Sequence, residues 1–211
     1  MGIICACPRD AALPDIPLDS CPESLGQIQK AIFQRVYSSG TTKNTIEDPT
    51  ALASWTPLLA AADSTKVVQS PYLQAPTSEA GAARTYGGGN ETLGGVELVI
   101  GKEPSTFTAN VLRSKQSTIA ALKALQCEDV GVFLVDENGQ IGCLADDVET
   151  PTTYYPIPVQ TLFVSDKSFG GLENPDMNML SWSLSPDWSD KFVIVSPSDF
   201  NALTDLVTPA S

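Results

Sequence analysis

Two apolar segments that flank a four-residue turn are the feature that most constrains the fold of this chain. Residues 130–135 and 140–145 are mostly apolar, and Asp136-Glu137-Asn138-Gly139 lies between them. An Asn-Gly pair accepts the positive backbone φ angles that tight hairpin turns require. The sequence therefore predicts an antiparallel hairpin here, and any fold of the chain has to contain it.

Further strands are expected on both sides of this hairpin. Apolar patterns typical of strands recur at residues 96–100, 106–112, 159–165, 178–184 and 191–195. One helix is expected over residues 115–126, where Ile119, Leu122 and Leu125 lie on one side. Strands interrupted by one helix, without β-α-β alternation, predict an α+β fold: an antiparallel β-sandwich or small barrel with a flanking helix.

The first 63 residues are expected to form an N-terminal arm and a helical segment. Residues 1–18 contain three prolines and no periodicity, which is typical of an extended arm. Residues 21–37 follow a possible cap at Asp19 or Ser20 and carry apolar side chains at three- and four-residue spacings, which predicts a helix. A second short helix is expected over residues 50–62, interrupted by Pro57.

The remaining chain divides into a loop and a core. Residues 64–95 show no strong periodicity and are rich in glycine towards their end, so we expect an extended Gly-rich assembly loop. Residues 96–211 are expected to form the β-sandwich core, with the helix over residues 115–126 at its side.

The composition narrows the chemistry that the chain can perform. The net charge is −13, and the 12 basic residues are scattered singly, whereas nucleic-acid binding needs clustered Lys and Arg. There is no histidine, which removes Ser-His and Cys-His catalysis and most zinc chemistry. We therefore expect no enzymatic activity, no metal and no cofactor.

The acidic residues gather in one part of the chain. No basic residue lies between Lys123 and Lys167, and eight acids do: Glu128, Asp129, Asp136, Glu137, Asp146, Asp147, Glu149 and Asp166. One interpretation is a solvated face that keeps the protein soluble. The other is a negative surface that DNA passes without binding.

Three motifs suggest ligand chemistry, and each has a simpler structural interpretation. The glycines within residues 86–95 match no phosphate-binding pattern, and a strand rather than a helix is expected after them. Residues 136–139 begin like a calcium loop, but the glycine comes two positions too early. Asp146-Asp147, Asp187 and Asp190 are candidates for the paired carboxylates of a glycosidase or acid protease, yet Asp187 and Asp190 flank a turn after Pro186.

Cysteine usage and hydropathy bear on the compartment. Five cysteines are an odd number at low density, which fits a reducing compartment better than a disulfide framework. Residues 1–9 lack the basic leader and apolar core of a signal peptide, and no apolar stretch approaches the roughly 20 residues that cross a membrane. We expect a soluble protein that is made in a cytoplasm and has no membrane partner.

From Arg84 onward the sequence is similar to a known family. Arg84-Thr85-Tyr86-Gly87-Gly88-Gly89-Asn90-Glu91-Thr92 leads into Gly95-Val96-Glu97-Leu98-Val99-Ile100-Gly101, and Phe107-Thr108 and Leu122-Lys123-Ala124-Leu125 follow. In this order, over residues 84–200, the chain resembles the tail tube (major tail) proteins and related virion proteins of tailed bacteriophages. The helix expected over residues 21–37 has no counterpart in this resemblance.

The resemblance implies a virion protein that is made in the cytoplasm of a bacterial host. It implies six subunits in a ring whose sheets join into a continuous barrel, and rings that stack into a tube through which DNA passes without specific binding. The N-terminal arm and the Gly-rich loop would contact neighbouring subunits, with these loop residues at the interface: Arg84, Tyr86, Gly87, Gly88, Gly89 and Asn90. Four acids would face the lumen: Asp136, Glu137, Asp146 and Asp147.

Other functions remain open at this point. A head–tail connector, a tail completion protein or a capsid decoration protein shares every compositional feature. An acidic adaptor of non-viral origin would use the Gly-rich loop as its contact surface. An enzyme would need a concave site that holds several carboxylates with raised pKa values.

Overall fold

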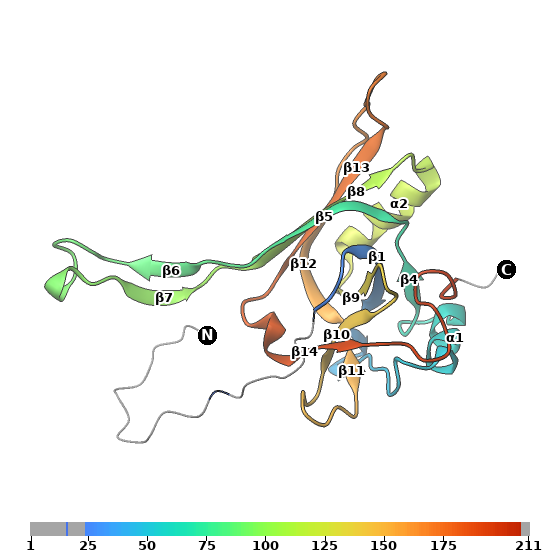
Figure 1. Cartoon of the computed structure of the whole chain (residues 1–211), viewed down its shortest axis with the longest axis horizontal. Helices are drawn as coiled ribbons and strands as arrows, with labels where there is room; N and C mark the ends of the chain where they lie inside the picture. The colour runs from blue at the N-terminus through green and yellow to red at the C-terminus, as the bar shows by residue number, and fades with distance from the viewer. Residues whose placement is uncertain (1–15, 17–23, 208–211) are drawn as a thin grey trace.

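The computed structural model describes residue 16 and residues 24–207, and its main element is one open antiparallel sheet (Figure 1). Its path runs β11-β10-β9-β12-β13-β8-β5, while β1 pairs with β9 and β4, and β14 pairs with β10. The ten strands are β1 (Ile28–Arg35), β4 (Val67–Gln69), β5 (Leu73–Glu79), β8 (Ser105–Leu112), β9 (Val130–Asp136), β10 (Ile141–Ala145), β11 (Tyr154–Tyr155), β12 (Ile157–Val164), β13 (Met177–Leu184) and β14 (Phe192–Val195).

The remaining elements are short. Two small hairpins pair β2 (Tyr37–Ser39) with β3 (Thr42–Lys43), and β6 (Ala83–Tyr86) with β7 (Leu98–Lys102). The described α-helices are α1 (Leu52–Ala60) and α2 (Gln116–Ala124), and single 3-10 turns are η1 (Leu93–Gly95), η2 (Leu125–Cys127) and η3 (Trp188–Lys191). Neither α-helix of the described part of the chain has the length and apolarity needed to cross a membrane.

The structure confirms antiparallel strands with helices, as the sequence predicts. Of the two expected arrangements, a sandwich or a small barrel, the closed barrel is wrong because the ten-stranded sheet remains open. The expected hairpin over residues 130–145 is β9 and β10, and the helix expected over residues 115–126 is α2 with η2. Residues 52–60 form one helix in spite of Pro57. The strands expected after residue 96 are also present, with boundaries that shift by up to two residues.

One prediction for the N-terminal segment is wrong. Of the helix expected over residues 21–37, the described part contains β1, whose partner is β9. The three- and four-residue spacing arises because both faces of this strand are buried: Phe33 packs in one hydrophobic cluster and Ile32 in the other. The polar side chains Lys30 and Gln34 of this strand are buried as well.

Long-range contacts explain how those polar side chains are buried. The Lys30 Nζ atom donates to the Leu203 carbonyl at 2.7 Å and lies 4.6 Å from the centre of the Tyr72 ring. The Gln34 Nε2 atom donates to the Thr65 carbonyl at 2.7 Å. Burial lowers the pKa of Lys30, because the charged form loses water.

The expected loop over residues 64–95 is also more regular than predicted, because it contributes β4, β5 and β6. Strand β5 lacks the alternation of apolar and polar residues by which a strand is recognised, because most of its side chains are exposed. It also carries Pro76, which is tolerated at the edge of a sheet. Strand pairing joins all three predicted segments: β1 of the first pairs with β9 of the third, and β5 of the second pairs with β8.

Strand β12 carries the sheet from one half to the other. Its residues Ile157 and Pro158 pair with β9, and the stretch from Val159 onward pairs with β13. The register shifts between Gln160 and Phe163, where Thr161 has a φ angle of 49°. A bulge of this kind bends a strand and increases its twist. The half that contains β5, β8 and β13 can therefore pack against the half that contains β1 and β9.

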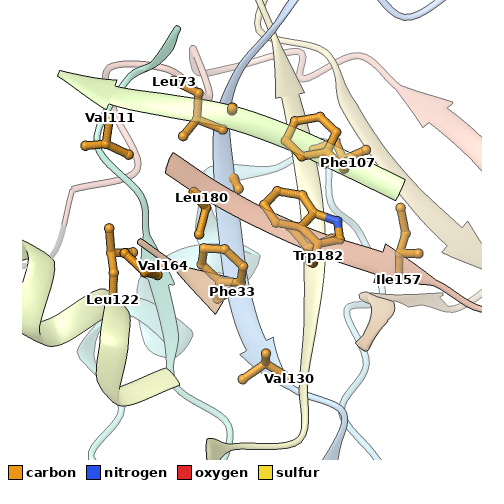
Figure 2. Packing of buried hydrophobic residues seen from close by; sticks show 14 of the residues in the cluster. Phe33, Leu73, Phe107, Val111, Leu122, Val130, Ile157, Val164, Leu180 and Trp182 are labelled. Atoms are coloured by element: carbon orange, nitrogen blue, oxygen red, sulfur yellow. The ribbon is translucent and has the colours of Figure 1, made fainter. Parts of the chain in front are cut away.

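Trp182 lies at the centre of the contact between the two halves. Its ring stacks on Phe107 with centroids 4.2 Å apart and meets the edge of Phe33 at 5.9 Å. Figure 2 shows these rings together with Leu180, which precedes Trp182 by two residues in β13 and therefore lies on the same face of the strand. The Trp182 Nε1 atom is buried and has no hydrogen-bond partner among the described residues. The contribution of Trp182 is therefore one of shape and apolar area.

We expect Trp182→Ala to lower the free energy of unfolding by about 3–5 kcal/mol, because it leaves a cavity between Phe33 and Phe107. Trp182→Phe should cost much less, since it keeps a ring and removes an unpaired N–H group. Phe163→Ala, at a half-exposed site, should cost less than about 1 kcal/mol. Urea unfolding measures all three, and equal losses for Trp182→Ala and Phe163→Ala would contradict this packing.

Candidate functional site: the β6–β7 arm

Between β5 and β8 the chain leaves the sheet and forms a projecting hairpin, residues 80–104, which we call the β6–β7 arm (Figure 1). Ala83 of β6 lies opposite Lys102 of β7, and Tyr86 lies opposite Leu98. Twelve extended residues reach at most about 40 Å. Figure 1 shows the arm extending well beyond the body that carries it.

The base of the arm is fixed to the body. Lys102 forms an ion pair with Asp187, and the Trp188 Nε1 atom donates to the Ser105 hydroxyl at 3.2 Å. A hydrogen bond from its side chain to Asp187, and the negative charge there, raise the pKa of Lys102. The two strands cross closely at Gly81, where a Cβ atom would lie 1.8 Å from the Glu103 carbonyl oxygen. These contacts set the direction in which the arm leaves the sheet.

The tip of the arm, residues 87–97, has a defined conformation. The Thr92 hydroxyl accepts a hydrogen bond from the Gly88 amide at 3.1 Å and donates one to the Val96 carbonyl at 2.6 Å. Gly88 has a φ angle of 109°, which residues with a side chain rarely adopt. The glycines therefore allow the backbone conformation of a folded tip.

Large apolar side chains of the arm are exposed to solvent. They are Tyr86, Leu93, Val96, Leu98, Val99 and Ile100, each more than half exposed. Tyr86 lies opposite Leu98, whereas Val99 lies opposite Thr85. Because neighbouring residues of a strand point to opposite faces, apolar side chains occur on both faces of the ribbon. A solvated monomer gains nothing from such a ribbon, so it is a candidate contact surface.

The six predicted interface residues are neighbours in the sequence, and all of them lie on this arm. Arg84 and Tyr86 lie in β6 with exposed side chains, and Gly87, Gly88, Gly89 and Asn90 begin the tip. Sequence reasoning missed Leu98, Val99 and Ile100, which it assigned to a core strand. A short apolar run is typical of a buried strand, and the only local sign of a projecting ribbon is the density of glycine before it.

The four predicted lumen acids do not form one cluster. Asp136 and Glu137 lie at the turn of the β9–β10 hairpin, while Asp146 and Asp147 follow the far end of β10. The five residues of β10 separate these groups by roughly 17 Å. Both groups can line one channel only if the hairpin runs along that channel.

Asp136 differs from the other three because its side chain is fully buried. Its carboxylate accepts hydrogen bonds from three backbone amides: Gly26 at 2.9 Å, Asn138 at 2.9 Å and Gln140 at 2.8 Å. This geometry closes the turn and ties it to the chain before β1. Asp136 is therefore a structural residue and contributes no charge to a surface that DNA could meet.

The side chain of Asp146 is held by hydrogen bonds within the loop that follows β10. The Asp146 carboxylate accepts hydrogen bonds from the Thr152 hydroxyl at 2.5 Å and from the amides of Thr152 and Thr153 at 3.0 and 3.1 Å. These hydrogen bonds hold the pKa of Asp146 well below its usual range, and the bond from the Thr152 hydroxyl has the largest effect. Asp147 and Glu137 are exposed. Within the described residues, no three Cys, Asp or Glu side chains are arranged to hold a metal ion.

Comparisons with known proteins assign no family to this arrangement. No family model matches the chain, and neither curated proteins nor solved structures gave a match.

We expect Asp136→Ala to lower the free energy of unfolding by about 3 kcal/mol, because two amides at the turn and the Gly26 amide before β1 lose their shared acceptor. Glu137→Ala, its exposed neighbour, should change that free energy by less than about 0.5 kcal/mol. Urea unfolding compares the two variants. A stable Asp136→Ala protein would show that the carboxylate is not needed for the turn.

Proposed function

We propose that this chain is a self-associating structural protein of a virion, and specifically a subunit of a bacteriophage tail tube. The proposal assigns no catalytic role to any residue. The observation that carries it is the β6–β7 arm, which is fixed at its base and exposes apolar side chains on both faces.

The area of the arm suits a protein partner. Six exposed apolar side chains, at roughly 100 Å² each, present about 600 Å² of apolar surface. A standard protein interface buries about 800 Å² on each partner. Covering these side chains supplies a driving force for association of about 25 cal/mol per Å² before the entropic cost of binding is subtracted.

The open sheet adds a second reason for self-association. Strand β5 ends the path of the sheet, so one of its edges carries backbone groups that have no strand partner among the described residues over part of its length. Unpaired strand edges are a template for pairing with another chain, and closure of a ring removes them. In the proposed assembly, six subunits join their sheets into a barrel, and the β6–β7 arms connect neighbouring subunits.

The acidic surface fits passage of DNA. The exposed acids Glu137 and Asp147 and the polar loop around Asp146 carry negative charge that repels phosphate. In the proposed tube these residues lie near the lumen. Asp136 is no longer proposed as a lumen residue, because its side chain is buried. The assembled protein would reside in the virion, after synthesis in the cytoplasm of the bacterial host.

A connector, tail completion or capsid decoration protein would use the same arm. These alternatives differ from a tube in assembly geometry, since a single ring or a lattice would form in place of stacked rings. A non-viral adaptor would keep the arm for a different partner and remain monomeric alone.

The test is electron microscopy of the purified protein together with its mass in solution over a range of concentrations. We expect rings or tubes with a central hole. Val99→Asp should abolish them, because it places a charge in the middle of the arm, while the circular dichroism spectrum stays unchanged. Val207→Asp makes the same change at a similarly exposed site outside the arm, and should assemble normally.

Two results would contradict the proposal. A wild-type protein that stays monomeric when concentrated would favour the adaptor. Normal assembly of Val99→Asp would show that the arm is not the contact.

A further inference from the structure

A small hollow on the body lies at the end of β10, and none of the residues that line it belongs to the β6–β7 arm. Its volume is about 180 Å³, and it is bordered by apolar parts of Val36, Leu144, Tyr155 and Pro158 and by the side chains of Lys43 and Lys191. We call it the two-lysine pocket. Sites for drug-sized ligands measure about 300–1,000 Å³, so this pocket suits a single apolar side chain better than a small-molecule ligand.

The pocket carries positive charge in a protein that is otherwise acidic. The Lys43 Nζ atom lies 5.4 Å from the centre of the Tyr155 ring, and the Lys191 Nζ atom donates to the Asp146 backbone carbonyl at 2.8 Å. Neither lysine takes part in the ion pairs found among the described residues.

Asp146 is the acid that borders the pocket. Its carboxylate is directed to the hydroxyl of Thr152 and to the amides of its own loop. It therefore reduces the positive charge of the pocket without forming an ion pair with either lysine. A carboxylate brought by a partner would find two ammonium groups available.

The tip of the β6–β7 arm has the complementary chemistry. Leu93 is fully exposed at its end, and Glu91 and Glu97 are exposed on either side of it. An apolar anchor that fills a pocket, surrounded by polar contacts, is the usual arrangement of an interaction hot spot. Opposite charges around the anchor favour one orientation and raise the association rate.

We infer that Leu93 of one subunit enters the two-lysine pocket of a second copy of this chain, with Glu91 and Glu97 close to Lys43 and Lys191. This inference rests on the proposed self-association and names the surface that receives the arm. The partner is a second copy because the arm, fixed by Lys102 and Asp187, leads away from the body that carries the pocket (Figure 1). Such a contact joins two different surfaces, so it extends into a ring or a filament.

Photo-crosslinking locates the contact directly. A benzoylphenylalanine placed at position 93 of the full chain, irradiated at a concentration where the protein assembles, should crosslink to peptides that contain Leu144, Tyr155 or Pro158 of another copy. The same probe at position 172, whose leucine is equally exposed beside Glu173, should not reach those peptides. Assembly with position-93 crosslinks elsewhere, or crosslinks from position 172 to the pocket, would overturn the inference and leave self-association intact. A protein that never assembles would overturn both proposals.

Charge exchange supplies an independent test. Lys43→Glu with Lys191→Glu should raise the concentration at which half of the protein assembles roughly tenfold, because two ion pairs become repulsive. Adding Glu91→Lys and Glu97→Lys should restore assembly to within about threefold of wild type. Lys66→Glu with Lys115→Glu makes the same charge change at exposed sites outside the pocket and should have little effect. Equal losses in both lysine pairs, or no rescue by the reversed acids, would refute the pairing.

Discussion

The packing of Trp182 between Phe107 and Phe33 is the contact on which the rest of the structure depends. It holds the β5-β8-β13 half of the sheet against the half that contains β1 and β9, after the bulge in β12 has turned the chain. The β6–β7 arm is inserted between β5 and β8, so this contact positions its base, and the contacts of Lys102 and Gly81 set the direction in which it leaves the sheet. A rigid core that aims an exposed apolar ribbon outward is suited to assembly with other chains.

The fold could be predicted where the pattern of apolar residues is local. The β9–β10 hairpin, α2 and the later strands have such patterns, and the structure confirms them. Strand β1 could not be predicted, because the burial of Lys30 and Gln34 depends on carbonyl groups of Leu203 and Thr65, far away in the sequence. Without those partners, the same residues fit an amphipathic helix equally well.

The candidate site was predictable in part for a similar reason. Glycine density marked Arg84, Tyr86 and the tip as an unusual segment, but nothing local distinguishes an exposed Val99 from a buried one. Exposure depends on whether another part of the chain covers the ribbon, and that is a property of the whole fold. Asp136 shows the reverse case: an acid in a turn was expected at the surface and is buried beneath the amides that it binds.

Hydrogen exchange of the backbone amides tests the central claim most directly, because it reports whether the β6–β7 arm is covered on association. In a dilute monomeric fraction, the amides of residues 83–102 should exchange quickly, whereas those of β9 remain protected. In the assembled fraction, we expect the arm amides to exchange at least about tenfold more slowly. Arm amides that are equally protected in the monomer, or equally unprotected in the assembly, would contradict the account.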